Sequence, residues 1–587
     1  MTSIDDLFKK PNLPSGSIKR KFEAPDAQEA YKASKLTSKS SPNGTHTNGA
    51  TVEDEEDDDD VEVGPSLPPE IDERDDADGR FFGGGVTRDT ADALDYVEEL
   101  DDDGLTVEKM DSAWLRRLAT SFGKKVTKNA ELRARYESEP QKFMGSEAEL
   151  DAEIKSWSLL SEHPDLYPEF AQSDSVANLV GLLAHDNTDI AIGAIEILSE
   201  LLDEDVEAEQ DQWDTLTAAL LDADLLELLM SNLKRLDENN ESDRSGVYHT
   251  LSIMESLASQ QATADKLGQE KILMWLCNRI KAPEQPLSQN KQYAAEVLQV
   301  LLQISQAMRK RLAVQIDGVD LFLQLLAAYR KRDPAKDSTE EEYAENIFDA
   351  LTCVCDEADG KSKFVEAEGV ELCLIMLKEG GFSKMRALRV LDHAVGGNTT
   401  AAAEVCAKII DAAGLKPIFG LLMKKPDPST CEHVLGILSA LLRLLPGQST
   451  GRIRTLAKFT EKAYEKTTKL VQLRQDYARR VKAVDDGIAL EQWMLDEEER
   501  EERADEFFSR RLDGGLFGLQ TTDIVLTWLI AEEVGAKTVV ASQLEAGGGS
   551  LADIKTSLQE QLGGLDIDSA DDEDTRDMLA TLLSFLP

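Results

Sequence analysis

Apolar residues recur through the middle of the chain in six blocks with a common helical pattern. The blocks start at Val176, Leu225, Ile272, Val319, Val370 and Leu415, so they are 49, 47, 47, 51 and 45 residues apart. Each is followed 14 to 24 residues later by a second apolar stretch, and these stretches start at Ile190, Val247, Tyr293, Tyr343, Lys384 and Cys431. The pattern predicts a repeated pair of helices.

One face of each predicted helix is apolar and must be covered by a neighbour, because residues such as Ile195, Leu198 and Leu202 recur at intervals of three and four. Stacked repeats of about 40 to 47 residues are typical of an all-α armadillo or HEAT-type right-handed superhelical solenoid, whose second long helices line a concave surface. Strand patterns are nearly absent, and a closed helical bundle predicts no fixed period. The pattern therefore favours a solenoid.

Glycine follows an acidic or small residue where several of the repeats begin. These steps are Asp317-Gly318, Glu368-Gly369 and Ala413-Gly414. Because glycine adopts backbone conformations that other residues avoid, we expect it to form the sharp turn that leads into the next helix.

Charge divides the chain further, since 113 Asp and Glu against 64 Lys and Arg give a formal net charge of -49. Residues 51–103 hold 23 acidic and three basic residues, including the run Glu53–Asp60. Such a segment buries too little apolar surface to fold alone. The organisation that we predict is a disordered tail at 1–80, an N-terminal helical cap at 81–170, armadillo-type repeats at 171–450 and a C-terminal helical region at 451–587.

The C-terminal region contains two features with distinct expectations. Residues 455–484 have the pattern of one long amphipathic helix. Residues 547–577 contain Gly-Gly-Gly-Ser and an acidic run, which predict a loosely tethered, partly flexible segment before a final short helix.

The N-terminal tail carries two basic clusters, Lys9-Lys10 and Lys19-Arg20-Lys21, separated by eight residues. Clustered cations on an extended segment are typical of a nuclear localisation signal that an import receptor binds. The signal is either bipartite or limited to residues 19–21, and the alternative is a solvated charge run. Six cysteines and an N-terminus without a signal-peptide pattern favour a reducing compartment. No apolar run reaches the length of a membrane span, so we expect a soluble protein that is located in the nucleus.

Motifs of catalysis and cofactor binding are weak. Gly447–Gly451 matches G-x-S-x-G, but a helix precedes it where a nucleophile elbow needs a strand. Gly360-Lys361-Ser362 resembles the end of a phosphate-binding loop without its first glycine. Cys353 and Cys355 fall on different faces of one helix, which favours core packing over zinc. The histidines at 163, 185, 249, 393 and 433 show no spacing to a partner carboxylate. We predict no enzyme, no cofactor and no metal site.

A partner-binding surface is the remaining expectation. The second helices carry a row of carboxylates that we expect on the concave side, and these are Glu196, Glu200, Glu255, Asp349 and Asp392. Such a row attracts Lys/Arg-rich peptides and repels nucleic-acid phosphates. The alternative is a solvated helix face, because Gln299 and Arg389 interrupt the row.

Several segments resemble the family of beta-catenin-like nuclear armadillo proteins. They are LLAHDNTDIAIGAIEILSELLDEDV, NLKRLDENNESDRSGVYHTL, ENIFDALTCV, ALRVLDHA, HVLGILSALLRLLPGQ and EFFSRRLDGGLFGLQ. The similarity includes loop residues such as 183–189 and 511–515 and extends from about Phe81 to near the C-terminus.

The resemblance implies a non-enzymatic spliceosome scaffold associated with the nineteen complex. It would bind basic localisation-type segments of splicing factors, among them the Myb-like cell-division-cycle five protein. It also implies the localisation signal and an ability to self-associate, which leaves a homodimer open. The alternative is an import adaptor of the importin-alpha kind. That class uses W-x-x-x-N pairs, and none of the six tryptophans has Asn four residues later.

Overall fold

The computed structural model describes residues 109–424, 427–565 and 570–587, and every regular element within these ranges is a helix. All described residues from Arg116 onward belong to one of its two compact units. The basic residues Lys9, Lys10, Lys19, Arg20 and Lys21 lie outside the described residues, as does the acidic run.

Each repeat contains three helices. A first helix is followed by a second helix, which contains the first apolar block, and by a third helix, which contains the second apolar stretch. The first helices are α6 (Tyr167–Ala171), α9 (Gln210–Asp222), α12 (Gln261–Leu267), α15 (Gln306–Gln315), α18 (Ala358–Glu366) and α21 (Thr400–Asp411). The second helices are α7 (Asp174–Gly181), α10 (Leu225–Leu233), α13 (Glu270–Lys281), α16 (Gly318–Leu326), α19 (Gly369–Glu379) and α22 (Leu415–Met423). The third helices are α8 (Thr188–Leu201), α11 (Glu241–Ala258), α14 (Gln289–Ile304), α17 (Thr339–Val354), α20 (Phe382–Val395) and α23 (Pro428–Leu444).

The predicted repeat of two helices was therefore incomplete, because the first helix of each repeat was not predicted. The apolar signal of the shortest ones is small: α6 has five residues, and α12 has seven and buries only Thr263, Ala264 and Leu267. A short helix with so few buried positions has too little periodicity to be separated from a loop.

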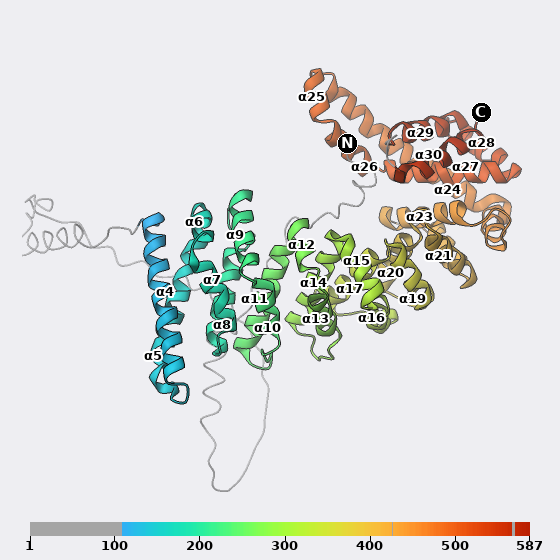
Figure 1. Ribbon diagram of the computed structural model, residues 1–587. Coiled ribbons are helices and arrows are strands. Elements are labelled where there is room, and N and C mark those ends of the chain that lie inside the picture. Colours follow the sequence, from blue (N-terminus) through green and yellow to red (C-terminus); the bar gives the residue numbers. More distant parts are fainter. Residues whose placement is uncertain (1–108, 425–426, 566–569) are drawn as a thin grey trace, which may run out of the picture. The chain divides into compact units, whose positions relative to one another are not determined.

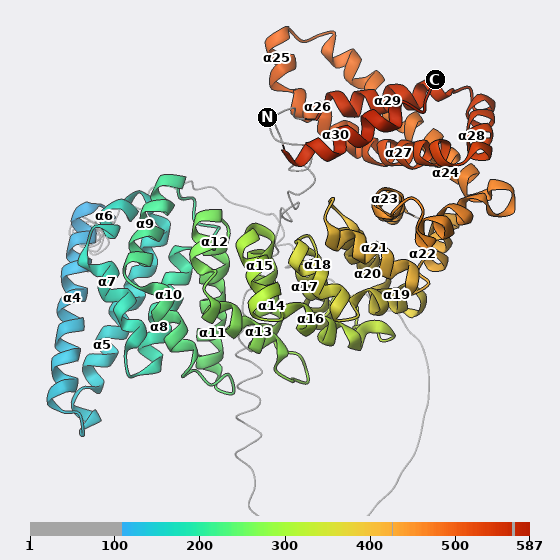
Figure 2. The same ribbon diagram turned by 45° about the vertical axis from the view of Figure 1, so that its right-hand side comes forward.

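The third helices pack side by side in chain order, α8 on α11, α11 on α14, α14 on α17, α17 on α20 and α20 on α23 (Figures 1 and 2). Their apolar faces are continuous in the core, where Ile195, Leu251, Leu298, Leu351 and Leu391 are fully buried. No repeat closes its own core, so stacking supplies the missing cover. The predicted all-α armadillo-type architecture is confirmed.

The turns into the second helices differ from the prediction. The residue in the left-handed region is the one before each expected glycine: Asp317 with φ 57°, Glu368 with φ 58° and Ala413 with φ 57°. Gly318 and Gly369 are needed for space, because an added Cβ would lie 2.5 Å from Leu312 Cγ in the first case and 2.3 Å from Phe364 Cδ2 in the second. The glycines allow first and second helices to approach closely.

The N-terminal helices α4 (Ser112–Arg135) and α5 (Met144–Lys155) precede the first repeat, and α5 packs against α8. A group of aromatic side chains fills the core beside them. Trp157 is fully buried, with its ring centroid 5.6 Å from that of Phe122 and 4.8 Å from that of Phe170.

The long C-terminal helix is interrupted. Within α24 (Thr450–Gln492), Glu461 is extended and residues 462–464 have positive φ values, so the prediction of one continuous helix over 455–484 was wrong. The change of direction lets the Tyr464 hydroxyl donate to Glu533 Oε1 at 3.2 Å. Left-handed residues cost about 1 to 2 kcal/mol each, and only tertiary contacts hold three in succession.

The expectation of loose tethering at 547–577 was wrong for part of that range. Residues Leu551–Gly563 form α29, which packs on α27 (Leu516–Glu532), with Ile554 and Leu558 fully buried. Asp523 of α27 is buried below this helix and accepts from Arg474 Nε at 2.8 Å. Burial raises the pKa of Asp523 to about 6, although Arg474 opposes the shift.

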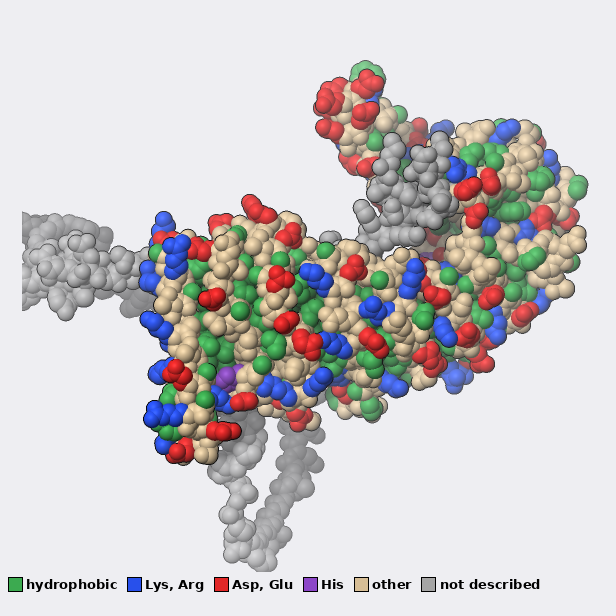
Figure 3. All heavy atoms as spheres, viewed as in Figure 1, with side chains coloured by type: hydrophobic (Ala, Val, Ile, Leu, Met, Phe, Trp, Pro, Cys, Tyr) green, Lys and Arg blue, Asp and Glu red, His purple; other side chains and the backbone are tan. Residues whose placement is uncertain are grey.

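No single helix among the residues described here is long and apolar enough to cross a membrane. Two pairs of consecutive helices in the same ranges reach that length and apolar content together, but each pair is sharply bent at the break between its helices. In the view of Figure 3, acidic and basic side chains are interspersed with apolar ones over most helices, and acidic ones gather on α25 (Glu497–Glu502).

Candidate functional site

The five carboxylates expected to contact a partner lie on four of the six third helices. Glu196 and Glu200 belong to α8, Glu255 to α11, Asp349 to α17 and Asp392 to α20. We call the surface formed by the partly exposed residues of α8, α11, α14, α17, α20 and α23 the third-helix face. The structure places all five carboxylates on it, and each one accepts a hydrogen bond or pairs with a charged side chain.

The carboxylates of α8 and α11 receive hydrogen bonds from hydroxyl groups. Ser245 Oγ donates to Glu196 Oε1 at 3.4 Å, Ser158 Oγ to Glu200 Oε1 at 2.6 Å, and the Tyr293 hydroxyl to Glu255 Oε2 at 2.6 Å. Two of these bonds join neighbouring third helices, α8 to α11 and α11 to α14. The hydroxyl donors are neutral, so they orient the carboxylates without cancelling their negative charge.

Asp349 of α17 pairs with an arginine, and Asp392 of α20 contacts a histidine. Arg389 NH1 lies 2.8 Å from Asp349 Oδ1, and His433 Nδ1 lies 2.9 Å from Asp392 Oδ2. Arg386 NH2 pairs in the same way with Glu345 Oε1 at 2.9 Å. The interruption at Arg389 is therefore an ion pair, which matches the negative charge of Asp349.

Partial burial changes the ionisation of two of these groups. Burial raises the pKa of Glu196 above its usual value, and the Ser245 hydrogen bond opposes the shift. Burial also raises the pKa of Asp349, against the lowering effect of Arg389. Carboxylates that are partly withdrawn from water interact more strongly with an approaching cation, because the effective dielectric constant is lower.

Further carboxylates on this face were missed by the sequence prediction, and three of them lie in the middle or first half of their helices. Glu296 of α14 is half-buried and accepts from Gln292 Nε2 at 2.7 Å, Glu345 is exposed, and Glu432 of α23 is half-buried. They occupy helical positions on the same repeat element as the predicted residues. A comparison of all six second stretches for acidic side chains would have found them.

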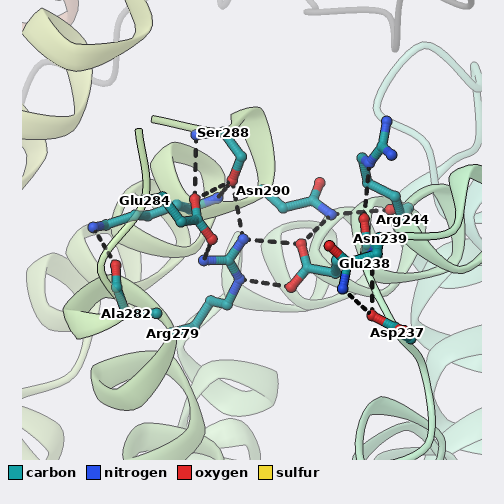
Figure 4. A network of polar contacts seen from close by, with 10 residues as sticks. Asp237, Glu238, Asn239, Arg244, Arg279, Ala282, Glu284, Ser288 and Asn290 are labelled. Carbon is teal, nitrogen blue, oxygen red and sulfur yellow. Dashed lines mark hydrogen bonds and ion pairs between the residues drawn. The ribbon is translucent and has the colours of Figure 1, made fainter. Parts of the chain in front are cut away.

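Loops between second and third helices fix the positions of α11 and α14 (Figure 4). Arg279 is 9% exposed and donates through Nε and NH2 to both oxygens of Glu238, at 2.7 and 2.9 Å. Its NH1 lies 2.7 Å from Glu284 Oε1. Asn290, in the first turn of α14, donates to Glu238 Oε2 at 2.9 Å and to the Arg244 carbonyl at 3.0 Å. This bidentate, buried network ties one repeat to the next and holds the third-helix face in place.

Two histidines have carboxylate partners that the sequence did not reveal. His433 contacts Asp392, and His393 Nδ1 lies 2.9 Å from Asp356 Oδ1. The prediction that these histidines lack such partners was wrong, since the pairs join different repeats, at separations of 41 and 37 residues. Burial alone would lower the pKa of His393, but the Asp356 carboxylate raises it above its usual value.

The residues that resembled catalytic motifs have structural roles here. Ser449 is the N-cap of α24 and accepts from the Arg452 amide at 3.1 Å. Lys361 is 2% exposed, and its Nζ donates to the carbonyls of Cys355, Asp356 and His393 at 2.8, 3.0 and 3.1 Å. Cys355 is buried and Cys353 half-buried, both as free thiols. Across the described ranges, no group of three or more His, Cys, Asp or Glu is arranged to hold a metal ion.

Comparison with known proteins shows which family the chain resembles. A family model described as "Catenin-beta-like, Arm-motif containing nuclear" matches residues 91–559. The chain is 37% identical over 460 residues to the Beta-catenin-like protein 1 homolog of Schizosaccharomyces pombe, covering 78% of this chain and 80% of the relative. It is 36% identical over 429 residues to Beta-catenin-like protein 1 of Homo sapiens, and 37% identical over 425 residues to that of Rattus norvegicus. Each of these two alignments covers 70% of this chain and 74% of the relative.

Proposed function

The chain belongs to the family of catenin-beta-like nuclear proteins with Arm motifs, and on that premise we propose that its helical repeats form a non-enzymatic nuclear scaffold for pre-mRNA splicing. The third-helix face binds Lys/Arg-rich segments of splicing factors, as the resemblance to beta-catenin-like proteins implied. The proteins of the nineteen complex, including the Myb-like cell-division-cycle five protein, are the partners that we propose.

The observation that carries this proposal is the charge of α8, α11 and α14. Glu196, Glu200 and Glu255 accept hydrogen bonds from neutral hydroxyl donors, which orient the carboxylates and do not themselves neutralise them. Asp349 pairs with the Arg389 guanidinium, and Asp392 contacts the His433 imidazole. Basic segments are therefore expected to bind chiefly along α8, α11 and α14, where carboxylates on a protein wall concentrate negative potential.

The proposal is tested by titrating the full chain with a fluorescent peptide that carries two Lys/Arg clusters. We expect a dissociation constant in the micromolar range or tighter that weakens as salt rises from about 50 to about 300 mM, because exposed charges are screened beyond roughly 8 Å at physiological ionic strength. The triple variant Glu196→Gln, Glu200→Gln, Glu255→Gln is expected to weaken binding about tenfold, because each carboxylate contributes less than about 1 kcal/mol to the binding free energy.

A matched triple variant makes the same change in net charge away from the third-helix face. Its substitutions fall on exposed carboxylates of α13, α18 and α21: Glu270→Gln, Asp359→Asn and Glu404→Gln. Little change is expected in this control. Equal weakening by both triple variants would show that total charge, and not this face, binds the peptide. The absence of binding, or binding indifferent to salt, would contradict the proposal altogether.

A further inference from the structure

Three large apolar side chains are exposed together where α24 ends. Leu490 is 70% exposed, Trp493 is 81% exposed and Met494 is 77% exposed. Leu490 lies in the last turn of α24, and Trp493 and Met494 follow directly after the helix end at Gln492, three and four residues further on. Single exposed apolar residues are ordinary, but a contiguous group with a tryptophan marks an interaction surface.

The chain itself leaves this group uncovered within the described ranges. After α24 the chain turns through α25 (Glu497–Glu502) and returns in α26 (Ala504–Asp513), where Arg503 and Arg510 pair with Glu491 at 3.3 and 2.7 Å. The only buried residue of α26 is Phe507, and α25 buries none. The helices of this hairpin are therefore held by ion pairs at its flank and not by burial of its apolar end.

Carboxylates follow the apolar group directly along the chain. Asp496 caps α25, and five of the six residues of that helix are glutamates. Glu497, Glu498, Glu501 and Glu502 are exposed, and Figure 3 shows acidic side chains on α25 with apolar ones beside them. A surface that combines an exposed tryptophan and methionine with a rim of carboxylates selects for an apolar ligand flanked by cations.

We propose that this hairpin end, formed by Leu490, Trp493, Met494 and the glutamates of α25, docks an amphipathic helix of a partner protein with Lys/Arg beside its apolar stripe. Tryptophan and methionine provide large apolar contacts that adapt to a helical ligand. An anionic membrane is disfavoured by the same carboxylates. The surface is separate from the third-helix face and goes beyond the peptide binding proposed for it.

The test uses the full chain and a fluorescent peptide of about 18 residues with leucines at helical spacing and lysines on both flanks. Fluorescence anisotropy is expected to give a micromolar dissociation constant. Trp493→Ala should weaken binding at least tenfold, and Glu498→Lys with Glu501→Lys should weaken it and flatten its salt dependence. Val534→Ala removes another exposed apolar side chain, 84% exposed on α28 (Val534–Ala546), and should leave binding unchanged.

Several results would overturn the proposal. These are the absence of peptide binding, a loss of affinity in Val534→Ala equal to that in Trp493→Ala, or equally tight binding of a peptide with glutamates in place of the lysines. If sedimentation shows a dimer that Trp493→Ala converts to a monomer, the occupant of this surface is a second copy of the chain. If the peptide binds only after residues 1–108 are removed, the occupant is that segment of the same chain. The Glu196, Glu200, Glu255 variant should bind this peptide normally, so failure here is distinguishable from failure of the proposed function.

Discussion

Lys361 is a buried cation whose role is structural. Its ammonium donates to two carbonyls at the end of α17 and to one at the end of α20. The His393 carbonyl also accepts from the Gly396 amide at 3.0 Å, and the C-terminal ends of helices attract positive charge. One side chain therefore caps two third helices and fixes the spacing of the repeats that contain them.

Replacing Lys361 by methionine keeps most of the stem volume and removes all three donors. We expect a loss of about 2 kcal/mol in the free energy of unfolding, because buried acceptors lose their hydrogen bonds. Lys363→Met is the control, since Lys363 is partly exposed and pairs with Glu366 at 2.8 Å, and it should cost less than about 0.5 kcal/mol. Urea denaturation followed by circular dichroism measures both, and similar losses would mean that the carbonyls are capped by other groups.

Turns between first and second helices show how element packing depends on single positions. The left-handed residue is Asp317 or Glu368, although such residues avoid this conformation. The next position is glycine, because Leu312 or Phe364 of the preceding segment occupies the space of a side chain. Space between helices decides the placement of glycine here, and backbone conformation does not.

Gly369→Ala should therefore destabilise the protein by about 1 to 3 kcal/mol, because the new methyl group overlaps the Phe364 ring and lies 2.9 Å from its carbonyl oxygen. Gly420→Ala, within α22, is the matched control, since no neighbouring atom lies within 4 Å of the added Cβ. The free energy of unfolding of this control should rise by up to about 1 kcal/mol, because alanine has a higher helix propensity than glycine. Thermal unfolding compares the two, and a stabilised Gly369→Ala variant would show that the turn relaxes freely.

At the scale of the whole molecule, charge is distributed unevenly along the chain. The formal net charge is -49, yet residues 1–50 hold eight Lys/Arg against five Asp/Glu. The only basic clusters in that segment are Lys9-Lys10 and Lys19-Arg20-Lys21. Because the family is described as nuclear, we propose that these clusters bind an import receptor.

Changing Lys19, Arg20 and Lys21 to alanine is expected to shift a fluorescent fusion of the full chain from nucleus to cytoplasm, since the receptor requires exposed cations. Changing Lys32, Lys35 and Lys39 removes the same charge from scattered positions and should leave the fusion nuclear. A further loss on changing Lys9 and Lys10 would indicate a bipartite signal. Unchanged localisation of all variants would show that another segment or a partner directs import.

The sequence by itself determined the helical class, the period of the repeats and the regions of charge. The reason is physical: helix periodicity and net charge are local properties that each segment carries without its neighbours. The armadillo-type fold followed, because amphipathic helices repeated at a fixed period can bury their faces only by stacking.

Only the tertiary structure decided which groups contact each carboxylate. Asp349, Asp392 and Glu255 look alike in sequence, but packing places Arg389, His433 and Tyr293 against them. It also decided the left-handed turn at 462–464, the packing of α29 and the exposure of Trp493. These features depend on contacts between residues about 40 or more positions apart or on their absence, and no local pattern encodes which side chains will meet.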